Sequence, residues 1–317
     1  MTGRSSGGTS AGPVGRLRTV RSDGTPVFRY DARPGVAPVS VVHVDHDTSD
    51  LPSDHRHAHD FLVLVYVEEG SGTVSIGGEE WELRDGTVIA VPPGQVMGVS
   101  AISRITHSHG WSVFFTPDAV PSLASVSPLA WSLHPLLSIF VADGGRALVP
   151  EADRQRWSSW FAELAEEVSD PSRLGARDAV AALLTRILVA ASRLAPPAGS
   201  VPDQLVTRVF DEIEAVFTEP VSAGDVAASL GYTTGHLTTV VRERTGRTLL
   251  DWITERRMVE ARRLLAETDL TLAAIASRTG LRDAAYLGRR FREWHGVTPE
   301  RWRRSTRSGQ VVPRSGG

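Results

Sequence analysis

The stretch Thr271–Trp302, TLAAIASRTGLRDAAYLGRRFREWHGVTPERW, has the pattern of two short helices joined by a tight turn. Gly280 marks the turn, because glycine readily adopts the left-handed backbone conformation that follows many helices. The helix after it carries a face rich in arginine, and Gly296 and Pro299 end it. This pattern predicts a helix-turn-helix whose second helix enters a groove of DNA.

A second copy of this pattern lies upstream. Residues 226–232, VAASLGY, match residues 275–281, IASRTGL, at an offset of 49 positions. Val241 then matches Phe291 at an offset of 50, so one residue is inserted in the second recognition helix or in its turn. Because two copies of one unit are stronger evidence than either copy alone, the chain is predicted to carry a double helix-turn-helix.

The helix that joins the two copies is predicted over residues 249–265. Helical spacing separates its apolar positions from its arginines. The apolar positions are expected to be buried: Trp252, Ile253, Met258, Ala261, Leu264 and Leu265. The arginines are expected to lie outside or near phosphates: Arg256, Arg257, Arg262 and Arg263.

The first unit is predicted to have helices over 222–230 and 234–244. Ser222 and Asp225 have the spacing of a capping pair, and Thr233 or Thr234 caps the second helix. The residues expected in the core are Leu237, Val240 and Val241. The residues that this leaves for DNA are Gly235, His236, Thr238, Thr239 and Arg242.

The second unit is predicted to have helices over 272–278 and 283–294, with Tyr286, Leu287 and Phe291 facing the core. The residues left for the groove and the phosphates are Arg282, Ala284, Ala285, Gly288, Arg289 and Arg292. Small residues beside arginine let a helix sit deep in a major groove, where arginine binds guanine through two hydrogen bonds. The alternative is a solvated arginine face, but the duplicated unit favours DNA.

The charge distribution agrees with a DNA partner for the C-terminal part. All 34 basic residues are arginine. Residues 1–200 hold 16 Arg against 22 Asp and Glu, a net charge of −6, whereas residues 242–317 hold 17 Arg against 9 acidic residues, a net charge of +8. An acidic N-terminal part and a basic C-terminal part indicate that the C-terminal part binds a polyanion.

Composition also excludes several classes of protein. The chain has no cysteine, which excludes disulfides, thiolate chemistry and cysteine-based zinc fingers. No apolar run approaches the roughly 18–20 residues of a membrane span, and the first residues lack the apolar core of a signal peptide. We therefore expect a soluble, cytoplasmic protein without a membrane partner.

Short strands separated by turns every 8–12 residues begin at Val39. The expected strands are Phe61–Val67, Thr73–Ile76, Glu80–Leu83, Thr87–Val91 and Trp111–Phe115. The expected turns are Gly70–Gly72, Gly77-Gly78, Asp85-Gly86 and Pro92-Pro93-Gly94. This spacing predicts a small all-β barrel or sandwich.

From about Pro128 the apolar spacing becomes helical. One helix face is predicted from Trp157, Trp160, Phe161, Leu164 and Val168, and Pro171 ends that helix. The next helix is predicted over Arg173–Leu194, with a near-heptad stripe of Val180, Leu183, Leu184, Ile187, Leu188, Ala191 and Leu194. This stripe either packs on the barrel or the neighbouring helix, or forms a dimer contact beside the linker at residues 195–200.

An ordered set of motifs lies within residues 203–304: Ala261–Leu265, Thr268–Leu272, Ile275-Ala276, Gly280, Tyr286, Phe291, Gly296 and Thr298-Pro299. This set resembles the C-terminal DNA-binding domain of the AraC/XylS family of bacterial transcription regulators. The resemblance implies two helix-turn-helix units, bridged by the 249–265 helix, that enter successive major grooves. Leu281 and Leu287 stand where the family usually has Phe, and Thr239 stands where the first recognition helix often carries a base-reading Arg.

The N-terminal half is similar to the cupin-type sensor domain common in that family. The motifs are His57-Ala58-His59 with Gly70-Ser71-Gly72, and then Gly86 with Pro92-Pro93-Gly94 and Met97. Metal-binding cupins add a Glu and a second-motif His, but Val63 and Leu64 stand near the Glu position and Met97 stands at the His position. The remaining imidazoles are too few for a typical Fe or Mn site.

We therefore expect no metal and no cofactor, although a replacement ligand from His55, His107 or His109 remains open. If the barrel binds a small-molecule effector, the candidate anchors are His57, His59, Tyr66, Met97 and Trp111.

Together these observations predict an α+β multidomain protein. The expected parts are a disordered N-terminus at 1–14, a cupin-like all-β barrel sensor domain at 15–127, a helical dimerisation segment and linker at 128–200, an all-α double helix-turn-helix domain at 201–306 and a disordered tail at 307–317.

The expected function is sequence-specific DNA binding in transcription regulation, without enzyme activity. The expected partners are operator or promoter DNA, a small-molecule effector, a second copy of the chain in a homodimer, and RNA polymerase if the protein is an activator. Two alternatives are a metal-dependent cupin enzyme with a DNA-binding tail and a constitutive DNA-binding protein with a vestigial barrel.

Overall fold

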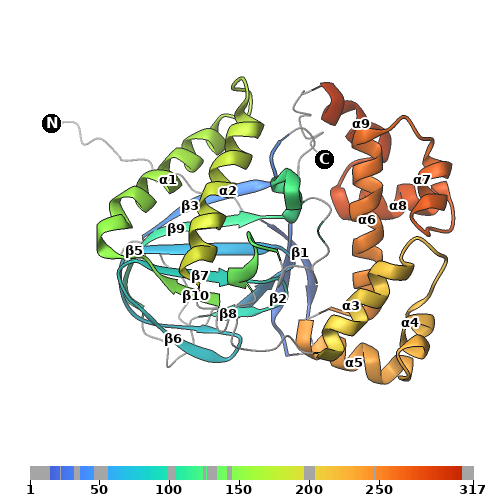
Figure 1. The fold of residues 1–317 in the computed structure, drawn as a ribbon, viewed down its shortest axis with the longest axis horizontal. Coiled ribbons are helices and arrows are strands. Elements are labelled where there is room, and N and C mark those ends of the chain that lie inside the picture. The colour runs from blue at the N-terminus through green and yellow to red at the C-terminus, as the bar shows by residue number, and fades with distance from the viewer. Residues whose placement is uncertain are drawn as a thin grey trace.

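In the computed structural model, a sheet covered by two helices forms the N-terminal half (residues 15–195), and seven helices form the C-terminal half (residues 204–308) (Figure 1). The structure describes residues 15–21, 23–31, 36–45, 56–98, 105–123, 126, 134–140, 145–195, 204–245 and 247–308. The disordered N-terminus expected at 1–14, the linker residues 196–200 and residues 309–317 lie outside the described residues. The prediction of a disordered tail from residue 307 is wrong for residues 307 and 308, which belong to α9. No described helix has the length and apolar content needed to span a membrane.

The ten strands of the N-terminal half form one sheet with the order β1-β2-β4-β8-β5-β7-β10. β6 and β9 pair with β5, and β3 pairs with β9. All pairs are antiparallel except β2 with β4. The strands are β1 (Gly15–Val20), β2 (Pro26–Tyr30), β3 (Val39–Asp45), β4 (Arg56–His59), β5 (Leu62–Ile76), β6 (Glu79–Leu83), β7 (Thr87–Val91), β8 (Val96–Gly98), β9 (Ile105–Phe115) and β10 (Arg146–Leu148).

Strand β5 is longer than the sequence predicted. The expected turn at Gly70–Gly72 is wrong, because residues 62–76 form one strand that pairs with β6, β7, β8 and β9. The hairpin at Gly77-Gly78 is confirmed: both glycines have positive φ, 63° and 90°, and Ile76 pairs with Glu79. Such backbone angles at both central residues match the twist of the flanking strands.

Two parts of the sheet were missed. The strands start at β1 and β2, well before Val39, and these two strands form a hairpin of their own. Strand β10 lies beyond residue 127 but pairs with β7. The predicted end of the sensor domain at residue 127 would therefore separate β10 from its sheet. Three short 3₁₀ turns accompany the sheet, at Pro117–Ala119, Pro121–Leu123 and Ser138–Phe140.

The helices α1 (Glu151–Ser169) and α2 (Ala176–Leu194) cover the outer face of the sheet (Figure 1). The predicted face of α1 is confirmed: Trp157, Phe161 and Leu164 are buried against the sheet. The apolar stripe of α2 packs in the same core. This agrees with the first of the two alternatives, in which the stripe packs on the barrel or on the neighbouring helix. α2 begins three residues later than predicted, after Gly175, whose φ is 77°.

The sheet therefore has two apolar faces. Leu62, Leu64 and Tyr66 of β5 belong to the outer core beneath α1 and α2. Val63 and Val67 belong to the inner core of the curled sheet, together with residues of β2, β6 and β7. This alternation follows from the period of two residues in a strand.

The C-terminal half contains two small cores joined by one helix. α6 contributes Leu249, Trp252 and Ile253 to the first core, and its later residues, from Met258 to Leu265, contribute to the second. All six apolar positions predicted to be buried in this helix are buried. The helices are α3 (Gln204–Val216), α4 (Ala223–Ser229), α5 (Thr234–Thr245), α6 (Leu249–Glu267), α7 (Leu272–Arg278), α8 (Ala284–His295) and α9 (Pro299–Ser308).

Candidate nucleic-acid interface

The first helix pair, α4 and α5, starts at the predicted caps. The Ser222 side chain accepts a hydrogen bond from the backbone N–H of Asp225, and the Asp225 carboxylate accepts one from the backbone N–H of Ser222 at 2.7 Å. The Thr233 hydroxyl accepts from the backbone N–H of His236 at 3.3 Å. These bonds satisfy N–H groups that have no partner within the helix, so they fix where each helix begins.

The second helix pair, α7 and α8, is capped in a related way. The Thr271 hydroxyl accepts from the backbone N–H of Ala274 at 3.2 Å, and the Asp283 carboxylate accepts from that of Tyr286 at 2.6 Å. This backbone bond, with a side-chain bond from Arg282, lowers the pKa of Asp283 below its usual range. Gly296, with a φ of 72°, ends α8 as predicted.

The extra residue of the second unit lies in the turn. α7 starts 49 positions after α4, at residue 272 against 223, whereas α8 starts 50 positions after α5, at 284 against 234. The turn therefore spans residues 230–233 in the first unit and 279–283 in the second. The two recognition helices have the same length. The insertion therefore lengthens the turn before α8 and leaves the length of the recognition helix unchanged.

One short segment, residues 217–221, fixes the two units to each other. Arg257 of α6 is buried and donates hydrogen bonds to the carbonyl oxygens of Phe217 at 2.9 Å, Glu219 at 2.6 Å and Val221 at 3.2 Å. Gly280 in the turn of the second unit packs against the same segment: a Cβ there would lie 2.5 Å from two of these carbonyl oxygens. The relative position of α5 and α8 therefore depends on this contact.

The predicted exposure of the α6 arginines is wrong for Arg256 and Arg257, both of which are 9% exposed. Arg256 forms an ion pair with Glu214 at 2.7 Å. Arg263 pairs with acidic residues of its own helix, and Arg262 pairs with Asp118 of the N-terminal half at 2.9 Å. These guanidinium groups hold the fold together and are not available for phosphates.

The predicted contact residues of α5 are mostly exposed. Gly235, His236, Thr239 and Arg242 are exposed, and Thr238 is half-buried. Leu237 and Val241 are fully buried, as predicted, whereas Val240 is only half-buried. The face contains one arginine, so its contacts with DNA would come mainly from hydroxyl, methyl and imidazole groups.

The face of α8 is more strongly basic. Arg282, Ala285, Arg289 and Arg292 are exposed, and Ala284 is half-buried. Arg282 pairs with Asp283 at 2.9 Å, but Arg289 and Arg292 form no ion pair with another described residue. Leu287 and Phe291 on the opposite side are completely buried. α8 therefore presents two arginines that no described acidic residue neutralises.

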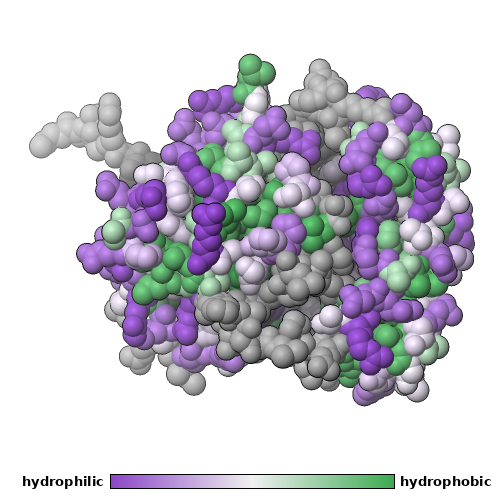
Figure 2. Space-filling model, in the orientation of Figure 1, coloured by the Kyte–Doolittle hydropathy of each residue, from purple (hydrophilic) through white to green (hydrophobic). Residues whose placement is uncertain are grey.

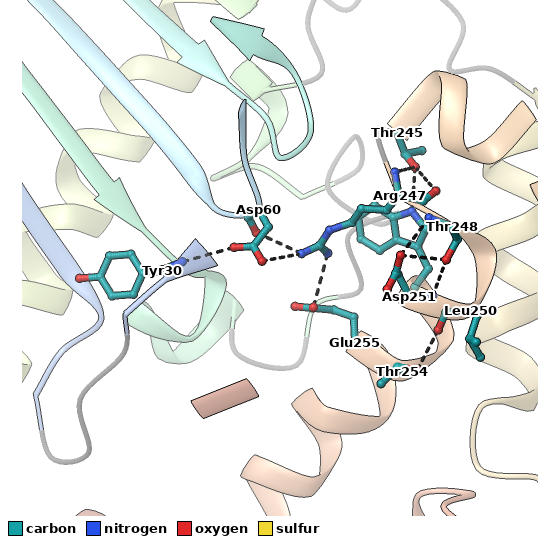
Figure 3. Close-up of polar contacts among 10 residues, drawn as sticks. Tyr30, Asp60, Thr245, Arg247, Thr248, Leu250, Asp251, Thr254 and Glu255 are labelled. Atoms are coloured by element: carbon teal, nitrogen blue, oxygen red, sulfur yellow. Dashed lines mark hydrogen bonds and ion pairs between the residues drawn. The ribbon is translucent and has the colours of Figure 1, made fainter. Parts of the chain in front are cut away.

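The two halves of the chain are joined by charged contacts that the sequence did not predict. Asp60, which follows β4, lies 3.3 Å from Arg247, and their side chains are only 5% and 7% exposed (Figure 3). Figure 3 also shows Glu255 of α6 beside the guanidinium group. Its Oε2 atom lies 3.4 Å from Arg247 Nη1. Arg29 of β2 donates to the carbonyl oxygen of Glu293 in α8 and lies over the Trp294 ring.

A cavity of about 60 Å³ lies between the halves, lined by residues that include Arg29, Asp60, Arg247 and His295. Ligand pockets are usually about 300–1,000 Å³. In this conformation the cavity is therefore large enough for water but not for a typical effector.

The five candidate effector anchors do not line one cavity. His57 lies opposite Met97 on the neighbouring strand, and the ring of His57 contacts that of His59 at 4.7 Å between centroids. These three residues lie on the inner side of the sheet, where Met97 packs on the inner core. Tyr66 and Trp111 instead belong to the outer core beneath α1 and α2, so their placement in the same pocket is wrong.

Within the part of the chain that the structure describes, His57 and His59 do not belong to a group of three possible metal ligands. Among the described residues, only one group of three His, Asp or Glu residues lies close enough together to bind a metal ion, and it includes neither His57 nor His59. Sites for iron or manganese normally use three or four nitrogen and oxygen ligands. The described residues around His57 and His59 therefore do not form the metal site of a metal-binding cupin.

Comparison with known proteins matches both halves. A family model described as a helix-turn-helix domain matches residues 226–305, and one described as an AraC-like ligand binding domain matches residues 44–125. The chain is 24% identical to the arabinose operon regulatory protein of Salmonella typhimurium, over 76% of this chain and 83% of that protein. It is 31% identical to the HTH-type transcriptional activator AarP of Providencia stuartii, over 32% of this chain and 75% of that protein.

Among solved structures, the DNA-binding domain of AdpA in complex with a target DNA is 27% identical. The match covers 33% of this chain and 95% of that chain, with a TM-score of 0.31.

Proposed function

The chain belongs to the AraC/XylS family of transcription regulators, and we propose that it binds its operator through the exposed faces of α5 and α8. It is a DNA-binding regulator with a ligand-binding domain. The observation that carries the proposal is the pair Arg289 and Arg292, exposed on α8 without a described acidic partner. An exposed arginine that forms no ion pair with a described residue is available for guanine or phosphate.

The two recognition helices contribute unequally in this proposal. α8 supplies most of the electrostatic affinity through Arg282, Arg289 and Arg292. The small residues Ala284 and Ala285, at the start of α8, allow a close approach to the floor of the groove. α5 supplies contacts of lower charge through His236 and Thr239, with Gly235 and Thr238 beside them and Arg242 near its end.

The rigid connection between the helices supports simultaneous binding. Because α6 belongs to both cores and Arg257 ties it to residues 217–221, α5 and α8 move as one body. Successive major grooves on one face of B-DNA lie about 34–36 Å apart. We infer that the pair spans two such grooves on one side of the duplex.

We also propose that a small-molecule effector binds inside the curled sheet, near His57, His59 and Met97. The match of residues 44–125 to a ligand-binding family model and the position of these three residues on one inner face support this site. Binding there would act on DNA through Asp60, which directly follows β4 and pairs with Arg247. By linkage, operator DNA would change effector affinity by the same factor.

A homodimer is the proposed working form, with a second copy bound through α1 and α2. The main stripe of α2 is already buried against the sheet, so the contact would use the remaining apolar residues. Figure 2 shows hydrophobic residues along the visible face of this region. The partly buried Leu183 and Val189 belong to α2, and the fully exposed Leu174 lies between the two helices. We place the protein in the cytoplasm, with RNA polymerase as a partner if it activates transcription.

The test is selection of bound sites from genomic fragments, followed by affinity measurements on the enriched sequence. Arg289→Ala is expected to weaken binding by about 1–3 kcal/mol and to relax the preference at one base pair if Arg289 reads a base. If it contacts only phosphate, binding should weaken equally on all sequences with a smaller salt dependence.

The matched control is Arg84→Ala, which removes an exposed arginine that follows β6 in the N-terminal half, outside the proposed dimer surface. It should leave both affinity and salt dependence unchanged. Wild-type affinity and salt dependence in the Arg289→Ala protein would show that α8 does not bind DNA through this face.

A further inference from the structure

The outer face of the sheet holds a cluster of two histidines and a carboxylate that DNA binding does not use. His43 of β3, Glu68 of β5 and His109 of β9 bring one ligand atom each within 4.8 Å of one another. Their neighbours Tyr66 and Trp111 belong to the core beneath α1 and α2. The cluster therefore lies on the opposite side of the sheet from the cupin-like histidine motif.

A β-bulge in β5 lies at the cluster. Val67 pairs with Gly110 and Glu69 pairs with His109, so Glu68 is an extra residue without a partner in β9. Such a β-bulge bends the strand locally. Gly110 is needed opposite it, because a Cβ there would collide with the carbonyl oxygen of Tyr66. Glu68 lies two positions after Tyr66 and therefore shares its outer side of the sheet, where His109 also lies.

The separations agree with those of metal ligands. The Oε2 atom of Glu68 lies 3.5 Å from His43 Nε2 and 3.4 Å from His109 Nδ1. Zinc bonds of about 2.0–2.1 Å in a tetrahedron place neighbouring ligand atoms about 3.3 Å apart. Two of the three distances between ligand atoms are therefore already close to this value. Small rotations of the two imidazole side chains would shorten the third distance to it.

We propose that His43, Glu68 and His109 bind a divalent transition-metal ion such as Zn²⁺. Two imidazoles and a carboxylate suit zinc and its neighbours in the first transition row, whereas magnesium and calcium prefer oxygen ligands alone. Three protein ligands leave one tetrahedral position for water. The site lies on the opposite side of the sheet from the inner face that we assign to the effector, and it does not depend on that assignment.

Neighbouring groups orient the carboxylate for this role. Trp111 Nε1 donates to Glu68 Oε1 at 3.0 Å, which leaves Oε2 facing the two imidazoles. Burial raises the pKa of Glu68, but hydrogen bonds from Ser158, Trp111 and His43 outweigh it and bring the pKa below its usual value. Hydrogen bonds to a ligand from such surrounding groups are typical of metal sites.

The location gives the ion a defined structural consequence. Ser158 belongs to α1, and Figure 1 shows this helix lying across β3 and β9. A metal ion bound by His43 and His109 would fasten these two strands together directly below α1. It would thus stiffen the surface through which we propose that two copies associate.

The experiment measures zinc binding to the full-length chain after treatment with a chelator. Equilibrium dialysis against ZnCl₂ is expected to give one zinc per chain. Glu68→Gln keeps the size of the side chain and its bond from Trp111, and it should weaken zinc binding at least tenfold. The matched control is His107→Ala, because His107 also lies on β9 and pairs with Glu69 at 3.8 Å but stands outside the cluster.

Two further variants separate the alternatives. His43→Ala should weaken zinc binding to a similar extent, and it alters an exposed side chain, so a folding defect at Glu68 would not obscure the result. His57→Ala should leave binding unchanged. The proposal is overturned if the wild-type chain binds no zinc, if both cluster variants bind as tightly as the wild type, or if binding is lost in His57→Ala or His107→Ala.

Discussion

Two glycines at equivalent places in the helix-turn-helix units make a matched pair for testing how the units are joined. Gly231 and Gly280 have φ values of 79° and 66°. A Cβ on Gly231 would meet nothing within 4 Å, whereas a Cβ on Gly280 would lie 2.5 Å from the carbonyl oxygens of Phe217 and Glu219. Alanine is therefore strained at both positions but collides with the backbone at only one.

The two substitutions should differ in magnitude. Alanine in the left-handed region costs about 1–2 kcal/mol, and this is the whole effect expected for Gly231→Ala. The collision at Gly280 adds about 1–3 kcal/mol, because both contacting atoms belong to the backbone and cannot rotate away. We therefore expect Gly280→Ala to destabilise the C-terminal half by about 2–5 kcal/mol.

Urea unfolding of the full-length variants, followed by circular dichroism, measures this difference. Operator affinity under conditions where both variants remain folded should fall further for Gly280→Ala, since its turn contacts the segment that positions α5 relative to α8. Equal destabilisation by the two substitutions would refute the inference that residues 217–221 clamp the second unit. Unchanged operator affinity in folded Gly280→Ala would refute its effect on helix placement.

Three other predictions address buried polar groups. Arg257→Met should destabilise the protein by about 3 kcal/mol or more, because three carbonyl oxygens lose a charged donor; urea unfolding with a loss below about 1 kcal/mol would contradict this. Asp60→Asn should weaken the contact between the halves by about 1.5–3 kcal/mol. A double-mutant cycle with Arg247→Met should show that the effects of the two substitutions on stability are strongly coupled. Additive effects would mean that the ion pair contributes nothing. Burial, with repulsion from two nearby arginines, lowers the pKa of His295 well below its usual value, so the unfolded chain binds more protons below about pH 6.5 and stability falls there. His295→Phe should reduce this loss between pH 7 and pH 5, and identical pH profiles of urea midpoints for the two proteins would contradict the assignment.

The features that the sequence predicted well are local. The caps at Ser222 and Thr233 depend on bonds between residues three positions apart, so a short motif contains all the information. The buried stripe of α6 depends only on helical period. The repeat itself located the inserted residue to within one helix and its turn.

The features that the sequence did not predict depend on distant partners. Arg256 and Arg257 resemble surface arginines in sequence, yet their partners, Glu214 and the carbonyl oxygens of 217–221, lie about 40 positions away. No local pattern distinguishes such an arginine from one that contacts phosphate. The same holds for Arg262, whose partner Asp118 belongs to the other half of the chain.

The error at Tyr66 and Trp111 has a different cause. Alternation of apolar and polar residues along a strand shows which face is buried in the core only when the other face is polar. Here Leu62, Val63 and Leu64 are all buried, because helices cover one face of β5 and the curled sheet covers the other. The sequence therefore contained no signal for deciding which residues lie on the inner side of the sheet.

The placement of the contacts between the halves indicates what kind of regulation this protein can use. Arg247 lies just before α6, and Arg262 lies near its end, about 20 Å along the helix axis from Leu249 at its start. Asp60 and Asp118 of the N-terminal half thus hold α6 at both ends, and α6 carries both helix-turn-helix units. A movement of the N-terminal half would displace α5 and α8 together and leave their mutual spacing, fixed by Arg257 and Gly280, unchanged. An effector would therefore alter which operator sites two copies of the chain reach together, rather than how one copy fits its own site.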